Sequence, residues 1–328
     1  MRLIRNHDIP RDAWLELLRN SDFSSPFQSP DFFDFHHGIN GYEGEAFAVE
    51  RNGVLVSLVV VSLQRESGIK SFFSRRGIIQ GGPLLTDLSS ANFLLLSVAK
   101  ALKRKVIYLE SRNLTNYESY KECFQSCGWE YLPWLNYQVS CIDFQAVKKN
   151  MSASRLRQVK KSISLGTEWR ESNSVNDLKR FYEILRILYS TKVKKPLPPF
   201  EYFESLMSKN LAKFLFVFIG EELIGGIVCP VFENKAIYEL YICGLDYEYR
   251  ENYPSVLATY AAIDWGSRLG LKYFDFMGAG ALGESYGVRE FKARFGGVEV
   301  EYGRFHWVAS PFLYAVGKFG MKLLSKLR

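Results

Sequence analysis

The stretch FLFVFIGEELIGGIVCPVF, residues 214–232, holds two β-rich runs on either side of a turn at residues 220–222. Two such runs around a short turn that contains glycine predict a β-hairpin. The stretch AFAVERNGVLVSLVVVSL, residues 46–63, has the same pattern around Asn52-Gly53, which is the strongest short hairpin signal. The chain therefore contains two matching predicted hairpins, one in each half.

Each hairpin is followed by a helix and a closing strand. Residues 93–112 (FLLLSVAKALKRKVIYLESR) and 255–278 (SVLATYAAIDWGSRLGLKYFDFMG) both have the pattern of a helix that leads into a strand. Antiparallel strands joined to another strand by a crossover helix form a mixed α/β unit. We therefore predict an α/β fold with mixed sheets in two tandem domains related by internal duplication, residues 1–147 and 148–308, followed by a C-terminal helix at 309–328.

The composition is that of a globular protein, because 47% of the 328 residues are hydrophobic and 23% are charged. Lys and Arg number 42 and Asp and Glu 35, so the net charge of +7 allows an anionic partner without requiring one. The five cysteines form no CxxC pair and the four histidines are scattered, so we predict no metal site and no disulfide framework. The N-terminus lacks the apolar run of a signal peptide, and the longest apolar stretch, residues 54–63, is too short to span a bilayer, so we expect a cytoplasmic protein.

A basic helix is predicted between the two halves, within residues 151–166. Apolar residues recur there at helical spacing, and Gly166 would end the helix. The expected buried stripe is Leu156, Val159 and Ile163. The basic residues on a neighbouring face are Arg157, Lys160 and Lys161, and we expect them to contact an anionic partner such as tRNA or a phosphorylated lipid.

A second basic helix is predicted after Ser310-Pro311, a good pair for a helix start. Its apolar face comprises Phe312, Val316, Phe319 and Leu323. Its lysines, at intervals of four, are Lys318, Lys322 and Lys326. Such a helix can lie on an anionic membrane or can pack on its own domain with its lysines in solvent, so peripheral contact with the inner face of a membrane stays open.

Several short motifs follow one another in a fixed order. They are a tyrosine-rich strand (YELYIC, residues 238–243), a helix that ends near a glycine, a YFDF strand (273–276) and the segment FKARFGG (291–297). In this order they resemble the Fem-type peptidyltransferases, relatives within the GNAT N-acyltransferase superfamily. In the first half, PFQSPDFFDF (26–35) and Gly82-Pro83-Leu84 also resemble segments of that family.

The resemblance implies a tandem GNAT-like fold that transfers an acyl group to an amine, without a further cofactor. Fem-type enzymes take the acyl group from aminoacyl-tRNA and pass it to the stem peptide of a peptidoglycan precursor, so the expected partners are an aminoacyl-tRNA and a lipid-linked or nucleotide-linked envelope precursor. One alternative is an acyl-CoA-dependent N-acyltransferase acting on an amino sugar or another small amine. A second alternative is a non-catalytic protein that binds RNA or lipid on the same fold.

The resemblance also implies catalytic residues. Lys292 would lie near the transferred carbonyl and stabilise the oxyanion, so we expect Lys292→Met to lower activity and to change stability little. Glu110, at the end of the strand in YLESR, and Asp275, at the analogous point of the second half, are the candidate bases, since burial can hold a carboxyl near neutral pKa. We regard Asp275 as the more structural of the two, because aromatic side chains crowd it.

The remaining candidates are substrate-binding residues. His36 and His37 lie near the position where the family has a phosphate-binding Lys, and Lys194 is close to the position of a family Arg. The full candidate set is Phe291, His36, His37, Lys194, Arg157, Lys160, Lys161 and Tyr241. The glycine-rich loop that binds acyl-CoA pyrophosphate at a helix N-terminus is missing from residues 250–255 (RENYPS), which disfavours the acyl-CoA alternative.

Overall fold

Two units make up the computed structural model, which describes residues 1–66, 68, 71–283 and 287–326, without the side chains of residue 72 and residues 319–326. Unit 1 comprises Met1–Trp134 and Glu301–Arg328, and unit 2 comprises Leu135–Val300. Each unit has its own sheets and its own hydrophobic core, so the two are described in turn.

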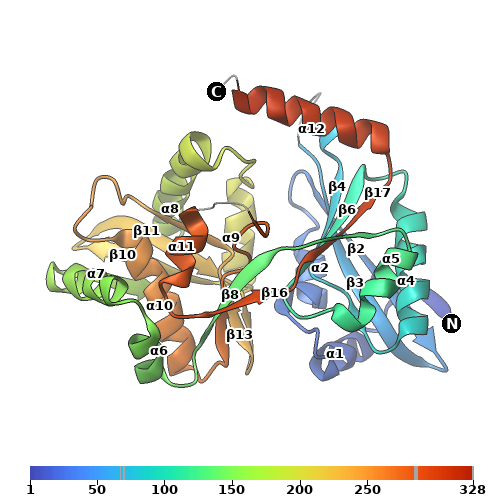
Figure 1. Ribbon diagram of the computed structural model, residues 1–328, viewed down its shortest axis with the longest axis horizontal. Helices are drawn as coiled ribbons and strands as arrows, with labels where there is room; N and C mark the ends of the chain where they lie inside the picture. The colour runs from blue at the N-terminus through green and yellow to red at the C-terminus, as the bar shows by residue number, and fades with distance from the viewer. Residues whose placement is uncertain (67, 69–70, 284–286, 327–328) are drawn as a thin grey trace. The chain divides into compact units, whose positions relative to one another are not determined.

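Unit 1 is built on a mixed sheet with the strand order β1-β2-β3-β4-β6-β17-β7 (Figure 1). The strands are β1 (Arg2–Arg5), β2 (Tyr42–Arg51), β3 (Val54–Gln64), β4 (Arg76–Gly81), β6 (Tyr108–Asn113), β7 (Glu130–Leu132) and β17 (Arg304–Val308), and β5 (Leu84–Leu85) pairs with β3. The strands β4 and β6 run parallel to each other. Asn52 and Gly53 join β2 to β3 with φ values of 53° and 82°, as a type I′ turn requires, so the predicted hairpin is confirmed.

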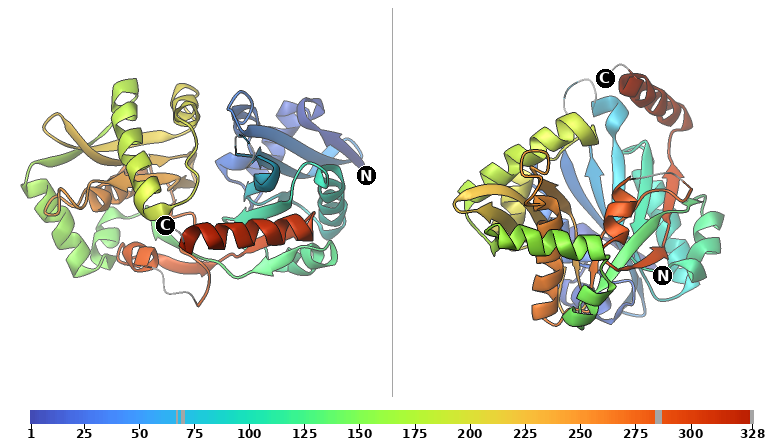
Figure 2. Two further views of the ribbon diagram at one scale, coloured as in Figure 1. Left: turned by 90° about the horizontal axis from the view of Figure 1, so that it is seen from above. Right: turned by 60° about the vertical axis from the view of Figure 1, so that its left-hand side comes forward.

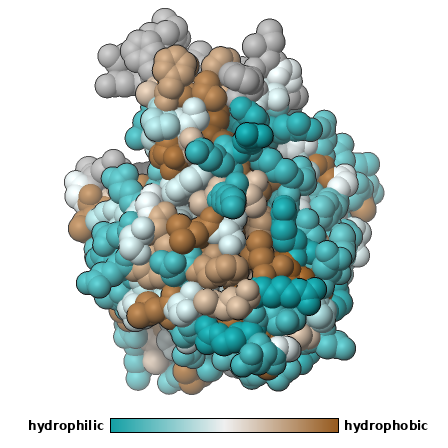
Figure 3. Space-filling model, turned by 90° about the vertical axis from the view of Figure 1, so that its right-hand side faces the viewer, coloured by the Kyte–Doolittle hydropathy of each residue, from teal (hydrophilic) through white to brown (hydrophobic). Residues whose placement is uncertain are grey.

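Helices cover unit 1 on both faces of the sheet. They are α1 (Arg11–Asn20), α2 (Pro30–Phe35), α3 (Ser71–Ser74), α4 (Leu88–Leu102), α5 (Lys121–Ser126) and α12 (Pro311–Lys326), with short 3-10 helices η1 (Asn6–Asp8), η2 (Pro26–Gln28) and η4 (Glu118–Tyr120). Side chains of α4 and α5 pack against Val59 and Val61 of β3, whereas α1 and α2 contact β2 and β3 on the opposite face. Apolar side chains lie among hydrophilic ones on the face that Figure 3 shows.

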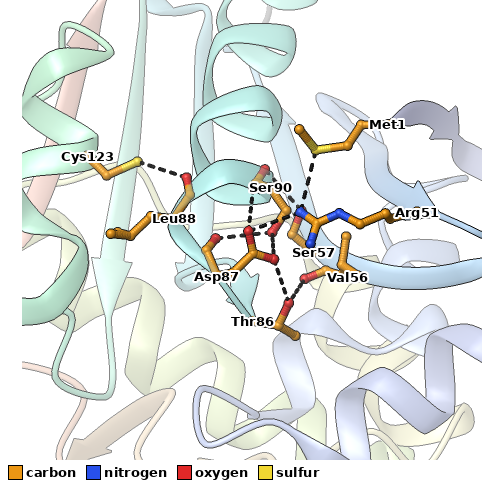
Figure 4. A network of polar contacts seen from close by, with 9 residues as sticks. All are labelled: Met1, Arg51, Val56, Ser57, Thr86, Asp87, Leu88, Ser90 and Cys123. Atoms are coloured by element: carbon orange, nitrogen blue, oxygen red, sulfur yellow. Dashed lines mark hydrogen bonds and ion pairs between the residues drawn. The ribbon is translucent and has the colours of Figure 1, made fainter.

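The start of α4 is fixed by Asp87 (Figure 4). Its Oδ1 accepts hydrogen bonds from the Ser90 backbone N–H and from Arg51, each at 3.0 Å, and its Oδ2 accepts from Thr86 at 3.2 Å. Burial opposes ionisation, but the bonds from Ser90 and Arg51 outweigh it and lower the pKa of the Asp87 carboxyl to about 2. This carboxylate is therefore the N-cap from which the helix begins at Leu88.

Unit 2 contains two sheets. The first has the order β14-β11-β10-β9 and the second the order β12-β13-β15-β8-β16. The strands are β8 (Leu135–Ser140), β9 (Thr167–Glu171), β10 (Lys213–Ile219), β11 (Glu222–Cys229), β12 (Val231–Phe232), β13 (Ala236–Tyr238), β14 (Tyr241–Gly244), β15 (Tyr273–Asp275) and β16 (Val298–Glu301). The second predicted hairpin, with its turn at residues 220–222, is confirmed as β10 and β11.

The helices α8 and α10 pack on the first sheet of unit 2. The helices of this unit are α6 (Phe144–Asn150), α7 (Ala153–Ser164), α8 (Val175–Leu188), α9 (Phe200–Ser208), α10 (Pro254–Arg268) and α11 (Gly287–Ala293), with a short π-helix, η5 (Tyr189–Val193). In β10, Leu215 and Val217 join the core cluster around α10, whereas Phe216 packs on Phe181 of α8. Since side chains alternate along a strand, α8 and α10 lie on opposite faces (Figure 2).

The two units repeat one topology, which confirms the predicted mixed α/β fold. In unit 1, β6 lies between the parallel strand β4 and the antiparallel strand β17, and in unit 2, β15 lies between the parallel strand β13 and the antiparallel strand β8. The helices α4 and α10 precede β6 and β15. Thus β17 and β8 hold equivalent positions, although β17 reaches unit 1 from the C-terminal end of the chain.

This strand placement corrects the predicted domain limits. The sequence predicted domains at 1–147 and 148–308, but the division falls after Trp134 and again before Glu301. The reason is strand pairing, because β8 belongs to the sheet of β15, and β17 belongs to the sheet of β6. A linear division of the chain could not show this exchange of strands.

The predicted basic helix, observed as α7, buries a different face from the expected one. Its buried residues are Arg155, Val159 and Ser162, whereas Ile163 is 52% exposed. The prediction that Ile163 belongs to the buried stripe is therefore wrong. Arg155 packs against two phenylalanines, and the Ser162 hydroxyl donates a hydrogen bond to the Asn252 carbonyl, so polar contacts set the rotation of the helix.

The C-terminal helix α12 packs on the sheet of unit 1 through Tyr314, whose ring lies 5.5 Å from that of Tyr108 and 4.9 Å from that of His306. Phe312, from the predicted apolar face, is 76% exposed. Of the other predicted positions, the side chains of Phe319, Lys322, Leu323 and Lys326 lie outside the described residues. Across the described ranges, none of the helices has the length and apolar character that a bilayer crossing needs.

Candidate active site

The two sheets of unit 2 separate at Glu239. Its backbone N–H still donates to the Asp275 carbonyl of β15 at 2.9 Å, but the next N–H, that of Leu240, donates to the Val228 carbonyl of β11 at 3.0 Å. The chain therefore leaves one sheet and enters the other between β13 and β14. A side chain at this position can therefore reach the space between the two sheets, which the hydrogen-bonded strands of neither sheet occupy.

Lys292 of α11 reaches the same place and is buried, with 7% of its surface exposed. Its Nζ lies 2.9 Å from Glu239 Oε1 and donates to the carbonyls of Phe276 and Gly278, each at 2.8 Å. These contacts use the three N–H donors of the ammonium group. The structure argues against the expectation that Lys292→Met leaves stability nearly unchanged, because the substitution would leave a buried carboxylate without its cation.

Glu239 is the residue that the sequence analysis missed. It is 7% exposed, and its Oε2 has no hydrogen-bond partner although it is buried. Burial and the nearby Asp275 raise the pKa of the Glu239 carboxyl above its ordinary range, although Lys292 opposes the shift. A buried carboxyl with one unused oxygen and a raised pKa is a candidate proton acceptor.

Asp275, one of the two candidate bases, is fully buried and well bonded. Its Oδ1 accepts from the Asn136 amide at 2.8 Å and from the Met277 backbone N–H at 2.7 Å, and its Oδ2 accepts from the Gln138 amide at 2.9 Å. Burial raises the pKa of the Asp275 carboxyl against the effect of these bonds. Asp275 thus orders the loop beyond β15, which carries the two carbonyls that hold Lys292.

Phe291 precedes Lys292 and is held by the basic helix α7. The Arg155 guanidinium lies 4.4 Å from the Phe291 ring centroid and 4.5 Å from that of Phe295, and it donates to the Phe291 carbonyl at 3.0 Å. The chain then turns at Gly296, where φ is +78° and a Cβ would lie 2.4 Å from the Asn150 backbone. Only glycine fits there, and the turn fixes the end of α11.

The N-terminus of α10, where acyl-CoA relatives are expected to hold pyrophosphate, is occupied by a carboxylate of the chain itself. The Ser255 N–H donates to Asp246 Oδ1 at 3.1 Å, and the Ser255 hydroxyl donates to the same carboxylate. Pro254 has no N–H to offer. A pyrophosphate at this helix end would have to displace Asp246.

Glu110, the other candidate base, lies in unit 1 and is ion-paired. Its Oε1 accepts from Arg112 Nε and from Arg304 Nη1, each at 2.7 Å. Burial opposes ionisation, but Arg112 and Arg304 lower the pKa of the Glu110 carboxyl below its ordinary range. A carboxylate held in this form is a weak proton acceptor, so the geometry favours Glu239 over Glu110 as the base.

The substrate-binding candidates fall into separate groups. His36 and His37 belong to unit 1, and burial together with His37 lowers the pKa of His36 to about 3, so His36 is neutral at pH 7. In unit 2, Tyr241 of β14 packs edge-on against Phe203, with ring centroids 4.8 Å apart, and Lys194 follows η5. Arg157, Lys160 and Lys161 are all exposed on α7, and Lys161 forms an ion pair with Glu251.

Among the residues that the structure describes, no three His, Cys, Asp or Glu side chains are grouped as metal ligands would be.

Of the predicted site residues, the structure brings together Lys292, Asp275 and Phe291. It adds Glu239 and Arg155 to them.

Comparisons with known proteins bear on the fold. Residues 151–293 match a family model described as an acetyltransferase (GNAT) domain, whereas no curated protein has a significantly similar sequence. The solved structure of FemX is 13% identical, with a TM-score of 0.72, and the match covers 95% of this chain and 99% of FemX. The tandem arrangement of two GNAT-like units is thereby confirmed.

Two further structures have the same architecture. A tandem GNAT protein from the clavulanic acid biosynthesis pathway is 10% identical with a TM-score of 0.61, and the match covers 94% of this chain and 99% of that one. The C-terminal DUF2156 domain of an Agrobacterium fabrum protein described as a lysylphosphatidylglycerol synthetase is 10% identical with a TM-score of 0.62, and the match covers 95% of this chain and 96% of that one.

Proposed function

We propose that the chain is a GNAT-type acyltransferase that transfers an aminoacyl group from aminoacyl-tRNA to an amine of a cell-envelope precursor. The match of residues 151–293 to a GNAT family model and the fold shared with FemX support this proposal. The observation that carries this proposal is the buried pair of Glu239 and Lys292, at the point where the sheets of unit 2 separate. The pair offers a proton acceptor and a cation within one site.

In the proposed reaction, the amine nitrogen attacks the carbonyl carbon of the aminoacyl ester. A C–N bond forms, the ester C–O bond breaks, and the ribose oxygen leaves as a hydroxyl with the proton that Glu239 has taken from the amine. Glu239 accepts the proton that the attacking amine loses, through the oxygen that Lys292 does not contact. Lys292 stabilises the oxyanion by exchanging one of its two carbonyl partners for the substrate oxygen. Phe291 packs beside the donor.

Aminoacyl-tRNA is the donor that the unit 2 surface favours over acyl-CoA. Asp246 occupies the helix end at which a CoA pyrophosphate would bind. The exposed basic face of α7, formed by Arg157, Lys160 and Lys161, offers positive charge to a phosphate backbone. The acceptor would be lipid-linked or nucleotide-linked, and in the first case the exposed Phe312 of α12 would support peripheral contact with the membrane.

The test is a mass-spectrometric screen of charged tRNAs and acyl-CoA donors against envelope precursors. We expect an aminoacylated product that Glu239→Gln reduces by about 10²–10⁴-fold, as is typical for the loss of a general base. The acid limb of the pH–rate profile should disappear in this variant, since the carboxyl that titrates is gone. A product formed only from acyl-CoA would contradict the proposed donor.

The donor is tested separately by tRNA binding. Replacing Arg157, Lys160 and Lys161 together by Gln should lower the slope of log affinity against log salt by up to about three units, since each phosphate contact contributes about one. The matched control is Lys179→Gln, an exposed residue of α8. An unchanged slope in the triple variant would show that the α7 face is solvated surface only.

A further inference from the structure

The C-terminal helix α12 lies at the end of the unit 1 sheet where β4 and β6 begin and β17 ends (Figure 1). Just before the helix, the N–H groups of Ala309 and Ser310 donate to the Ile107 carbonyl at 2.9 and 3.2 Å. Further along, a Cβ at Gly317 would lie 3.7 Å from the Phe73 carbonyl of α3. The helix therefore runs from β17 to α3, the helix that precedes β4, and α3 and α12 adjoin each other.

One face of α12 packs on unit 1 and another does not. Leu313, Tyr314 and Gly317 are partly buried, and Tyr314 packs on the sheet. Phe312 and Val316, one turn apart, are 76% and 39% exposed. The sequence left packing on the domain and contact with a membrane as alternatives, but the helix that packs on the sheet still keeps these two apolar side chains in solvent.

A second exposed phenylalanine adds to this apolar surface. Phe73 of α3 is 46% exposed, although its backbone lies against α12. Single exposed apolar residues are common on proteins, but exposed apolar side chains grouped on adjoining helices indicate an interaction surface. We call Phe73, Phe312 and Val316 the apolar patch.

Basic residues border the apolar patch. Lys318 is exposed on α12, with its Nζ 4.7 Å from the Tyr314 ring centroid. Lys103 and Arg104 are exposed in the connection from α4 to β6. The Arg104 carbonyl accepts a hydrogen bond at 3.4 Å from Arg75, which directly follows α3. Cations from three separate segments thus lie at the same end of the sheet.

Carboxylates do not balance these cations. The segments 71–76, 99–109 and 302–318, which meet at this end, contain no Asp or Glu. On nearby strands, Glu43 and Glu45 are bound by Lys105, and Glu110 is bound by two arginines. Glu66, before α3, and Glu130, on β7 beside β17, stand against four cations, which are Arg75, Lys103, Arg104 and Lys318. The border of the apolar patch is therefore positively charged.

We propose that the apolar patch and its basic border are a docking surface for an anionic lipid bilayer. The two phenylalanines and Val316 enter the boundary between headgroups and acyl chains, while Lys103, Arg104 and Lys318 contact lipid phosphates. A second copy of the chain would bring the same positive charge to the surface, which opposes self-association. The inference rests on the proposed function, since a bilayer suits a lipid-linked acceptor, but its test measures binding and not turnover.

The experiment is sedimentation of the full chain with vesicles of phosphatidylglycerol and phosphatidylcholine at low salt. We expect binding that is much weaker on phosphatidylcholine alone and that falls at high salt. Replacing Lys103 and Arg104 together by Gln should weaken binding by about 25-fold, because each basic residue near the bilayer contributes about fivefold. The matched control is Arg2→Gln, an exposed arginine at the opposite end of the sheet.

The apolar part of the surface is tested by Phe312→Ser. Burial of a phenylalanine side chain away from water contributes about tenfold or more in affinity, so this variant should bind anionic vesicles weaker by that factor. Its melting temperature should not change, because the side chain is exposed in the free protein. The matched control is Val54→Ser, an exposed valine at the opposite end of β3.

Three results would overturn the proposal: no binding of the wild type to anionic vesicles, equal binding to phosphatidylcholine alone, or wild-type affinity in Phe312→Ser. Dimerisation in analytical ultracentrifugation that Phe312→Ser abolishes, without binding to vesicles, would assign the apolar patch to a second copy of the chain instead. Aminoacyl transfer is measured separately. A chain that binds vesicles without transferring an aminoacyl group contradicts the proposed function alone, and an active chain that does not bind vesicles contradicts this inference alone.

Discussion

Glu110 in unit 1 and Asp275 in unit 2 occupy the same place in a repeated topology but have opposite electrostatic surroundings. Each is the third residue of its strand, each is paired with the third residue of a parallel neighbour, Ile78 or Tyr238, and each faces an antiparallel strand on its other side. Glu110 is bound by two arginines, whereas Asp275 is bound by two amides and a backbone N–H.

The pKa shifts follow from these partners. Cations lower the pKa of Glu110, whereas neutral donors do not overcome the burial that raises the pKa of Asp275. The same scaffold position therefore gives a fixed negative charge in unit 1 and a carboxyl that resists ionisation in unit 2.

The largest effect is expected for Lys292→Met. Removing one partner of a buried ion pair leaves Glu239 charged without a counter-ion, so the free energy of unfolding should fall by about 3–5 kcal/mol. Acyl transfer should fall by about 10²–10³-fold, as for the loss of an oxyanion donor. Chemical denaturation and turnover measure the two effects.

A double variant separates them. Adding Glu239→Gln to Lys292→Met removes the stranded charge, so most of the lost stability should return while activity stays low. The exposed Lys179→Met is the matched control and should change neither quantity. If Lys292→Met alone is as stable as the wild type, the buried pair does not have the energetic role assigned to it.

A smaller effect, of opposite sign in the two units, is expected in the pH dependence of stability. The lowered pKa of Glu110 stabilises the fold above the ordinary pKa of glutamate, and this contribution is lost as the pH falls through the lowered value. The raised pKa of Asp275 acts in reverse, because its contribution is present below the ordinary pKa of aspartate and is lost as the pH rises towards the raised value.

Unfolding measurements from pH 3 to pH 8 check this contrast. The difference in stability between wild type and Glu110→Gln should grow as the pH rises through the acid range, whereas the corresponding difference for Asp275→Asn should shrink. Both variants lose hydrogen bonds, at about 1–3 kcal/mol each for buried groups, so the diagnostic quantity is the slope and not the absolute loss. Parallel slopes would remove the electrostatic distinction between the units.

Local sequence signals predicted the parts of the fold that local interactions determine. The hairpin at Asn52-Gly53 and the helix that ends before Gly166 follow from residues next to each other in the chain. The buried face of α7 could not be predicted in this way, because Arg155 is held by Phe291, which is 136 residues away in the sequence. The exchange of β8 and β17 has the same cause, since strand pairing partners are distant in sequence.

The candidate site was predictable only in part. Lys292 and Phe291 came from a motif, and the structure places Lys292 against the loop that follows Asp275. Glu239 gave no signal, because a glutamate in the tyrosine-rich run 238–243 is typical of the solvent face of a strand. Its burial becomes evident only when the separation of two sheets places it against Lys292. No spacing rule in the sequence marks that point.

The smallest effect is expected at the start of α4 in unit 1, where Asp87→Ala removes a helix cap that the equivalent helix of unit 2 builds differently. The N-cap of α10 is Tyr253, which makes no side-chain cap bond, and Asp246 binds Ser255 from an earlier loop.

Loss of the Asp87 cap should lower the free energy of unfolding by about 1 kcal/mol at pH 7. The reason is that the Ser90 N–H and the Arg51 guanidinium both lose their acceptor. The deficit should narrow as the pH falls from 4 towards 2, since the wild-type carboxylate itself takes up a proton at a pKa of about 2. Urea denaturation of both proteins at several pH values measures it, with Asp87→Asn as the control that keeps a capping side chain. A constant deficit across that range would show that the cap acts by its shape and hydrogen bonds rather than by its charge.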